Sequence, residues 1–497
     1  MRDRLAAASV FAALLFSYAW FFGGSGFNQN ATFDLTRALV EQQRLDIGAY
    51  AANTADISLH DGRVYSNKAP GLAFVAAVPY ALLHAIGGTP QDVFRLNLYL
   101  YICTLLTCGV SGALIGLLVY YAVRHRGATQ RIAYAIALLT GLGTPLFAYS
   151  TMLFAHVPAA TLLLLSFLLL DGTFERRPAL AGAAAGAATV VNYLSAPVVV
   201  ILLLFTGRRR DALAFIAGGL PFALLLAAYQ LAAFGSPFRT SIETMNPAFI
   251  EKGAALGIFH LPRLDALWGI TLSPYRGLFF LSPLMLLALL GLTLLEKKRD
   301  AIAIGLTALV LVLLNASFNG WHGGYAVGPR YLIAAVPLLA IGLGPIARRA
   351  RLLFAVVAAV SVLFNVAVTA VDPQPPDVLR DPITAYALPS LVAGGVAEDD
   401  ESVPIWIRQL YTGHTSTNRV APDEMMPFQR HAPGSPASEW ASFNLGELLF
   451  GPGAFASILP WLAGLALIIL ATRASLRDRH HDSAPTRDTQ TERSRSA

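Results

Sequence analysis

The sequence predicts an all-α integral membrane protein with about twelve transmembrane helices and a large first external loop that carries interfacial helices. Of the 497 residues, 55% are hydrophobic and only 13% are charged, whereas soluble domains average about 25% charged residues. The mean hydropathy is +0.56. Uninterrupted apolar runs such as 278–295 and 352–371 match the length that a helix needs to cross a bilayer. A soluble core is therefore excluded.

Basic residues predict the topology. The net charge is +6, but the Lys and Arg residues lie in short clusters between apolar runs, which indicates membrane orientation and not a nucleic-acid partner. If every cluster is cytoplasmic, the chain crosses an even number of times between neighbouring clusters. The clusters are Arg2/Arg4, Arg124/Arg126/Arg131, Arg176/Arg177, Arg208–Arg210, Lys297–Arg299, Arg348/Arg349/Arg351 and Arg473/Arg477/Arg479. The expected spans are 5–23, 95–122, 131–148, 154–172, 178–190, 191–207, 211–233, 277–295, 300–317, 331–347, 352–371 and 453–472.

The segment between Arg177 and Arg208 is short for the two membrane spans that it must contain. Between Arg177 and Arg208 the polar Asn192 and the helix-disrupting Pro197 stand in the middle of the apolar sequence. Two short or broken helices that meet below the far surface fit this pattern.

The chain divides into four segments. Residues 1–371 form the transmembrane module, whose first external loop, 24–94, holds a helix-like stretch at 33–43 that we expect along the interface. Residues 372–452 are rich in Pro and acidic residues and predict an external cap, and residues 453–473 form the last transmembrane helix. Residues 474–497 have almost no apolar side chains and predict a disordered cytoplasmic tail.

The first external loop has side chains suited to catalysis. Asp34 and Asp56 precede Lys68, which stands just before a Pro-Gly turn. A carboxylate near the membrane surface can take a proton from a hydroxyl, and a lysine there can neutralise a phosphate. The structural alternative is that Asp34 caps or solvates an interfacial helix and that Lys68 reaches to the lipid headgroups.

A second candidate segment is 318–330. Its four glycines within nine residues allow close backbone approach, and Trp321 and Tyr325 offer flat faces that stack on sugars or sit at membrane interfaces. Arg330 breaks the positive-inside pattern and is suited to fork onto a phosphate. The alternative is a glycine-rich turn with an interfacial Trp.

The predicted spans contain almost no ionisable residues near their centres, which argues against an ion-coupled transporter. His156, just inside a span, and Arg276, before another, are weaker candidates. A lone His near a helix end is more often a structural residue than a catalytic one, and Arg276 is equally explained as an anchor for a lipid headgroup.

Three motifs together resemble the GT-C superfamily of polytopic glycosyltransferases, which includes the protein O-mannosyltransferases and the bacterial lipid A aminoarabinose transferases. They are FDLTRALVE at 33–41, YSNKAPG at 65–71 and GGYAVGPR at 323–330, and they look like those of a poorly characterised bacterial branch. The resemblance covers roughly residues 1–370. It implies a GT-C-like fold and a polyprenyl-phosphate-linked sugar donor, with an acidic residue of the first loop as general base. Lys68 matches the phosphate-contacting lysine of the aminoarabinose transferases.

The chain departs from this pattern after its first span. Where the aminoarabinose transferases carry an Asp-Glu pair, Asn28 and Gln29 stand here, and amides cannot take a proton at neutral pH. The base is then Asp34 or Asp56. Asp34 is preferred because its neighbours match the motif best, but the sequence does not choose between them.

The predicted function is transfer of a sugar from the lipid-linked donor to an acceptor hydroxyl of a cell-envelope glycan, lipid or protein. Asp34 or Asp56 would be the base, and Lys68 with Arg330 would stabilise the phosphate leaving group. The residues expected to bind substrate are Arg37, Trp321, His322 and Tyr325. Arg37 and Asp46 are of second rank, as residues that orient the base or contact the acceptor. No metal-ligand cluster or cofactor motif is evident, and the pattern does not exclude a divalent cation.

The expected location is the bacterial inner membrane, with the active site facing the periplasm or exterior; the expected partners are the donor, the acceptor and membrane lipids, without nucleic acid. Two alternatives stay open. The protein could be a flippase or transporter of lipid or lipid-linked sugar, in which the broken segments act as gates, or a non-catalytic assembly subunit. The sequence leaves the sugar and the acceptor unspecified.

Overall fold

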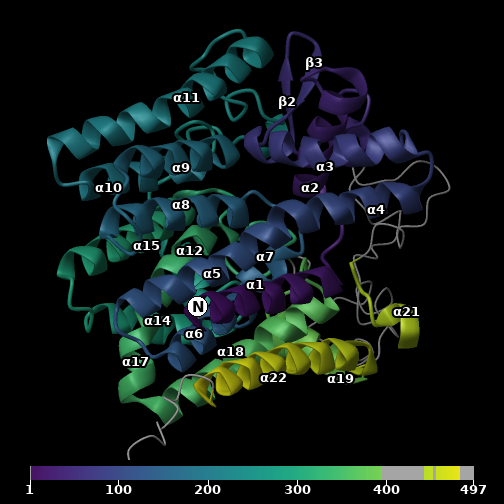
Figure 1. The fold of residues 1–497 in the computed structure, drawn as a ribbon. Coiled ribbons are helices and arrows are strands. Elements are labelled where there is room, and N and C mark those ends of the chain that lie inside the picture. The colour runs from purple at the N-terminus through teal and green to yellow at the C-terminus, as the bar shows by residue number, and fades with distance from the viewer. Residues whose placement is uncertain (1, 376, 378, 394–441, 451–454, 482–497) are drawn as a thin grey trace, which may run out of the picture.

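The computed structural model describes residues 2–375, 377, 379–393, 442–450 and 455–481. Helices dominate this part of the chain, which confirms the all-α prediction. Figure 1 shows α1 (Arg2–Trp20), α5 (Val110–His125), α8 (His156–Asp171) and α22 (Leu459–His481) running side by side across the view. The centre of the predicted cap, 394–441, and the tail residues 482–497 lie outside the described residues.

The chain is a multi-pass membrane protein. Within the described residues, five helices are long and apolar enough to cross a bilayer, and a pair bent by 55° would make a sixth. The five are Phe94–His125, Arg209–Phe234, Lys298–Ser317, Arg351–Val371 and Ala456–Ser475, and the bent pair is Arg330–Ala340 with Leu343–Arg349. The expected count of about twelve spans is therefore not confirmed.

Several expected spans are helices that break within their length. The broken pairs are α6 (Gln130–Leu142) with α7 (Leu146–Ser150), α9 (Pro178–Val191) with α10 (Ala196–Phe205), and α13 (Leu278–Leu281) with α14 (Leu284–Leu292). Pro145 and Pro283 directly precede α7 and α14, as expected of a residue without a backbone N–H. Asn192 has an extended backbone between α9 and α10, so the break predicted there is confirmed.

The remaining helices complete the bundle. They are α4 (Val93–Thr104), α11 (Arg209–Phe234), α12 (Leu264–Thr271), α15 (Lys298–Ser317), α16 (Val336–Ala340), α17 (Leu343–Arg349), α18 (Arg351–Val371), α19 (Leu388–Ala393) and α21 (Glu447–Phe450). A π-helical segment, Leu105–Gly109, joins α4 to α5 without a break in direction of the chain. Helices α9 and α11 pack against each other through small residues on both sides.

Segment 24–94, which we expect to be the first external loop, folds into a compact unit. It contains α2 (Phe27–Arg37), strands β2 (Ile57–His60) and β3 (Arg63–Ser66), and α3 (Gly71–Gly87). The strands pair antiparallel around Asp61 and Gly62, which both have positive φ, the conformation that Asp-Gly hairpin turns favour. The helix expected at 33–43 begins earlier, at Phe27, and is buried around most of its circumference, because α3 and β3 pack against it.

The two ends of the described chain meet. Strand β1 (Phe21–Phe22) pairs antiparallel with β4 (Phe443–Asn444). Trp461 Nε1 of α22 donates a hydrogen bond of 3.0 Å to Ser17 Oγ of α1, and both residues are buried. The last helix therefore packs directly on the first.

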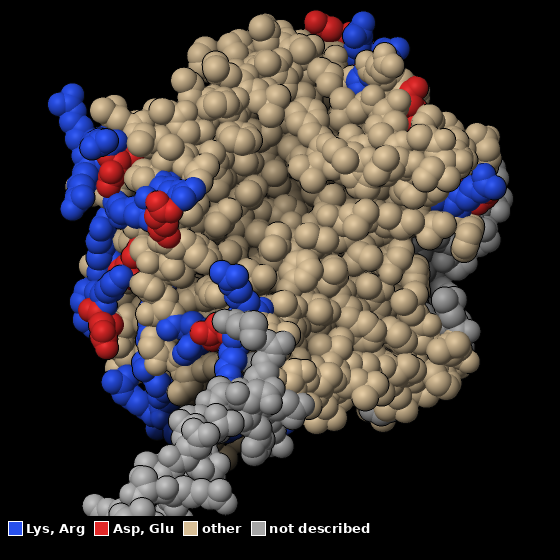
Figure 2. Space-filling view, in the orientation of Figure 1, with Lys and Arg blue, Asp and Glu red and all other residues tan. Residues whose placement is uncertain are grey.

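Basic residues gather at one end of the bundle. Figure 2 shows Lys and Arg side chains concentrated along the left side, where the α10–α11 turn lies in Figure 1, while the middle of this face is almost free of charge. Helix α15 begins there at Lys298, α11 begins there at Arg209, and α8 ends there at Asp171. We call this the basic end, and it matches the clusters expected on one side of the membrane.

Candidate active site

A cavity of about 160 Å³ lies at the opposite ends of α8 and α15. It is bounded by the start of α8, the break between α9 and α10, the end of α15 and the loop that follows β3. Its polar lining consists of Asn28, Thr32, Asn67, Lys68, His156, Asn192, Tyr193, Asn315, Arg330 and Tyr331. Its apolar lining consists of Ala69, Ala155, Val191, Leu194, Ile242, Met245, Ile258, Phe259, Leu311, Leu314 and Phe318.

The β2–β3 hairpin positions Lys68 and Asp56. Ile57 stands opposite Ser66 in the ladder, so the residues just beyond the strands also face each other, and the Asn67 N–H donates to the Asp56 carbonyl at 3.1 Å. Lys68 Nζ lies 2.9 Å from Asp56 Oδ2. Asn67 Nδ2 donates to the other carboxylate oxygen of Asp56 at 3.2 Å. Asp56 thus reaches the cavity through its ion pair with Lys68.

The surroundings of Lys68 act on its positive charge in opposite directions. Burial lowers the pKa of its ammonium group, the Asp56 carboxylate opposes this shift, and the positive charge of Arg330 adds to it. Two cations therefore share the cavity with a single adjacent carboxylate. An anion that entered the cavity would relieve their repulsion.

Arg330 presents an unused donor. Its Nη2 donates to the Tyr331 hydroxyl at 2.8 Å, and its guanidinium faces the rings of Tyr331 and Phe154 at 4.9 and 5.6 Å from their centroids. Its Nε is buried and has no hydrogen-bond partner among the described residues. A buried donor without an acceptor costs free energy. This guanidinium is therefore suited to bind an acceptor such as phosphate through two parallel hydrogen bonds.

His156 is oriented by the helix break. The Asn192 side-chain oxygen accepts from the Leu194 N–H at 3.1 Å, so its amide nitrogen faces His156 Nδ1 at 3.0 Å. An amide nitrogen only donates, so Nδ1 is the acceptor and the neutral ring carries its hydrogen on Nε2. His156 therefore offers a fixed N–H donor in the cavity wall.

Asp34 is separated from the cavity. It is 1% exposed and does not belong to the lining. Asn53 Nδ2 donates weakly to its Oδ1 at 3.4 Å, and its Oδ2 has no partner among the described residues. Burial raises the pKa of Asp34 well above its usual range, and the charge of Arg37 offsets this only in part. Burial therefore disfavours the charged form of this carboxyl.

The other predicted substrate-binding residues lie outside the lining. Arg37 pairs with Glu41 at 2.9 Å, and Trp321 packs against the backbone of Gly269. His322 stacks beside Tyr275. Tyr325 and Asp46 are also absent from the lining. The structure therefore brings together Lys68, Arg330 and, through its ion pair, Asp56.

Sequence reasoning missed part of the polar lining. Asn28 and Thr32 are four residues apart on α2 and so share one face, a pattern visible once the helix is started at Phe27. The sequence marks Asn192 only as a helix breaker. Tyr331 and Asn315 carried no signal of their own. Over the described ranges, no three His, Cys, Asp or Glu residues are grouped so that they could hold a metal ion.

Solved structures offer a distant likeness. ArnT from Cupriavidus metallidurans in the apo state matches with 17% identity and a TM-score of 0.45, over 78% of this chain and 68% of that one. ArnT bound to undecaprenyl phosphate matches with 14% identity and a TM-score of 0.43, over 78% and 70%. The archaeal oligosaccharyltransferase AglB from Archaeoglobus fulgidus, in complex with an inhibitory peptide and a dolichol-phosphate, matches with 13% identity and a TM-score of 0.43, over 71% and 52%.

These solved structures are of GT-C glycosyltransferases, the superfamily that the three sequence motifs resemble. At these identities and TM-scores the likeness assigns no activity to the chain. No protein-family model matches the sequence, and no curated protein matches it either.

Proposed function

We propose that the chain is a GT-C membrane glycosyltransferase that moves a sugar from a polyprenyl-phosphate-linked donor to an acceptor hydroxyl. The observation that carries this proposal is the convergence of Lys68 and Arg330, from distant parts of the sequence, on one cavity in which Asp56 contacts Lys68. Two cations and one carboxylate are what the reaction needs for a phosphate leaving group and a base.

The cavity suits a lipid phosphate. Lys68 and Arg330 supply positive charge, and the free Nε–H of Arg330 supplies a directed donor. The apolar side of the lining offers contacts for an isoprenoid chain beside the phosphate. An Nε2–H on His156 adds a neutral donor in the same wall.

Asp56 is the base that the geometry favours. It is in contact with Lys68 at the cavity, whereas Asp34 is buried away from it. When the donor phosphate takes over Lys68, a carboxylate oxygen of Asp56 is released to accept a proton. The acceptor oxygen then bonds to the anomeric carbon as the bond from that carbon to the phosphate oxygen breaks, and the acceptor proton moves to Asp56. The leaving phosphate keeps the electron pair, and Lys68 and Arg330 stabilise its charge.

We infer that the reaction takes place on the non-cytoplasmic face of a bacterial inner membrane. Helices α8, α9 and α15 each have one end at the cavity and the other near the basic end. Basic residues at span ends are retained in the cytoplasm, so the cavity opens on the other side. The acceptor is a hydroxyl of a cell-envelope glycan, lipid or protein.

The test is release of polyprenyl phosphate from a lipid-linked sugar by the purified protein in nanodiscs, a readout that covers any acceptor supplied. We expect Asp56→Asn to lower the rate by about 10²–10⁴-fold while binding of undecaprenyl phosphate stays within a few-fold. The matched control is Asp61→Asn at the exposed hairpin tip, which should transfer normally. Equal rates for both variants would refute the role of Asp56. Movement of the donor across the bilayer without cleavage would favour a flippase.

A further inference from the structure

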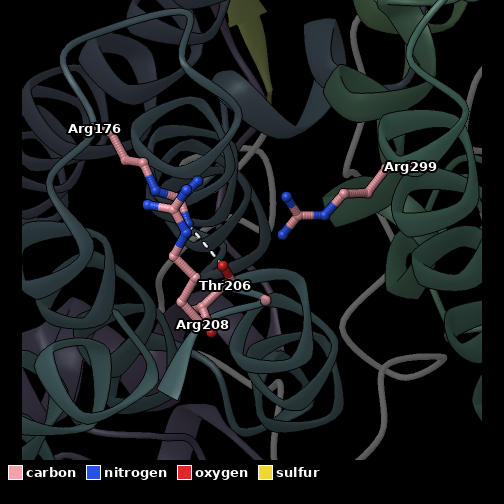
Figure 3. Close-up of a pocket in the computed structure, with 5 residues that line it drawn as sticks. Arg176, Thr206, Arg208 and Arg299 are labelled. Atoms are coloured by element: carbon pink, nitrogen blue, oxygen red, sulfur yellow. Dashed lines mark hydrogen bonds between the residues drawn. The ribbon is translucent and has the colours of Figure 1, made fainter. Parts of the chain in front are cut away.

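A second cavity, of about 270 Å³, lies at the basic end, on the far side of the bundle from the candidate active site. It is lined by Arg176, Thr206, Gly207, Arg208 and Arg299. These residues come from the α8–α9 loop, the α10–α11 turn and the first turn of α15. Figure 3 shows the Arg299 guanidinium directed across the cavity toward Arg176 and Arg208.

Only one of the three arginines is neutralised. Arg176 forms an ion pair with Asp211 at 2.8 Å and donates to the Thr206 carbonyl at 2.7 Å, the bond drawn in Figure 3. The side chains of Arg208 and Arg299 make no hydrogen bond or ion pair with any described residue. Arg299 is instead held by the Phe205 ring, whose centroid lies 4.2 Å from its Cζ.

The turn keeps this space open. Gly207 has a φ of +73°, and a Cβ there would lie 3.0 Å from Arg299 Nη2, so a larger residue would be strained and would crowd the guanidinium. The 26-residue helix α11 begins just after Arg208, which provides no side-chain cap. Its first backbone N–H groups add partial positive charge at the same place.

We propose that this cavity binds a phosphate group. Two unpaired guanidiniums with a third held in place match the oxygens of a phosphate, which arginine contacts in forked geometry. The cavity lies at the ends of α10, α11 and α15, and α11 and α15 are long and apolar enough to span the membrane. That depth is where the phosphates of anionic phospholipids lie. The site is independent of the proposed transferase chemistry.

The experiment compares two charge-matched double variants of the full-length protein in detergent. Arg208→Gln/Arg299→Gln removes the two unpaired arginines, both of which are exposed and carry no structural contact beyond the Phe205 ring. Arg348→Gln/Arg349→Gln removes two other exposed arginines at the end of α17. Binding of phosphatidylglycerol, with phosphatidylcholine as the zwitterionic reference, is measured by native mass spectrometry, and inorganic phosphate is titrated separately.

We expect the first double variant to bind phosphatidylglycerol at least about tenfold more weakly and the second to stay within about twofold of the native protein. If inorganic phosphate binds and its binding is lost in the same variant, the occupant is a free phosphate, and if it does not bind, the occupant is a headgroup. Equal losses in both double variants, or no loss in either, would overturn the proposal. Transferase activity does not enter this readout.

Discussion

The guanidinium of Arg330 packs against two aromatic rings, and its buried Nε has no hydrogen-bond partner among the described residues. Both its charge and its planar shape are therefore used in the site. Lysine at this position would keep the charge but lose the fork and the ring contacts. We expect Arg330→Lys to lower the rate of donor cleavage by about 10²-fold. The measurement is steady-state release of polyprenyl phosphate. Arg95→Lys, at an exposed pair with Asp92, is the control, and a normal rate for Arg330→Lys would contradict a directed contact.

For Asp34 we predict an effect on stability. Its pKa in the folded state is raised by burial, so the folded protein holds its proton more tightly than the unfolded chain. Its contribution to stability is therefore complete below the unfolded pKa and is lost as the pH rises through the folded pKa. Asparagine imitates the protonated acid, so Asp34→Asn should unfold at a higher temperature than the native protein in alkaline buffer and at a similar temperature in acid.

The check is thermal unfolding in detergent across this pH range, with Asp61→Asn at the exposed turn as the control. Loss of stability at every pH would show that the carboxyl of Asp34 has a structural role that an amide cannot fill. Donor cleavage is measured on the same samples. If Asp34→Asn abolishes cleavage while Asp56→Asn does not, the base is Asp34, as the sequence motif first suggested.

At the scale of elements, helix α9 approaches α11 so closely that glycine is required. A Cβ on Gly182 would lie 1.8 Å from the Phe215 carbonyl oxygen, a backbone atom that cannot turn aside. We expect Gly182→Ala to destabilise the fold by about 1–3 kcal/mol. Gly305→Ala in α15 is the control, since a Cβ there meets nothing within 4 Å, and it should stabilise the protein by about 0.5–1 kcal/mol. Denaturation in micelles measures both, and equal stability of the two variants would contradict the close contact.

The elements themselves were largely predictable. Apolar runs marked the helices, basic clusters marked the basic end, and Asn192 with Pro197 marked a helix break because a polar amide and a missing N–H both weaken a span. The same logic applied to Pro145 and Pro283 would have predicted the breaks before α7 and α14. The start of α2 was misplaced because its first turn is polar but buried, and helical periodicity detects only apolar faces.

The site was predictable only in part. Lys68 and Arg330 stood out one by one through local motifs, but their convergence depends on the packing of helices distant in sequence. The position of Asp34 outside the cavity also depends on tertiary packing. The residues around Asp34 match the sequence motif whether or not its side chain faces the cavity. His156 and Asn192 needed the broken helix to be placed beside α8.

At the scale of the whole molecule, one ionic cluster joins three helices near the basic end. Arg126, at the end of α5, contacts Asp300 of α15 at 2.6 Å and also pairs with Asp171 of α8. Both carboxylates are at most 4% exposed. Arg126→Met would leave both carboxylates buried without the guanidinium that neutralises them, although Thr173 still donates to Asp171, and we expect a loss of stability of about 3–5 kcal/mol.

The control for this cluster is Arg177→Met, since Arg177 and its partner Glu175 are both more than half exposed and such pairs contribute little. Thermal unfolding of the two variants is compared in the same detergent. Adding Asp300→Asn to Arg126→Met should recover part of the loss, because one uncompensated charge is removed. If Arg126→Met unfolds at the same temperature as Arg177→Met, the cluster does not hold the helices together.

The contact between α1 and α22 has a consequence for biosynthesis. Helix α1 is translated long before α22, because the hydrogen bond between Ser17 and Trp461 joins residues that are 444 positions apart in the sequence, and Phe21 packs on the same indole ring. The side of α1 that packs on α22 therefore lacks this neighbour until α22 has been translated. A ribosome stalled before α22 would leave a chain in which α1 lacks this contact, a state that membrane quality control can recognise.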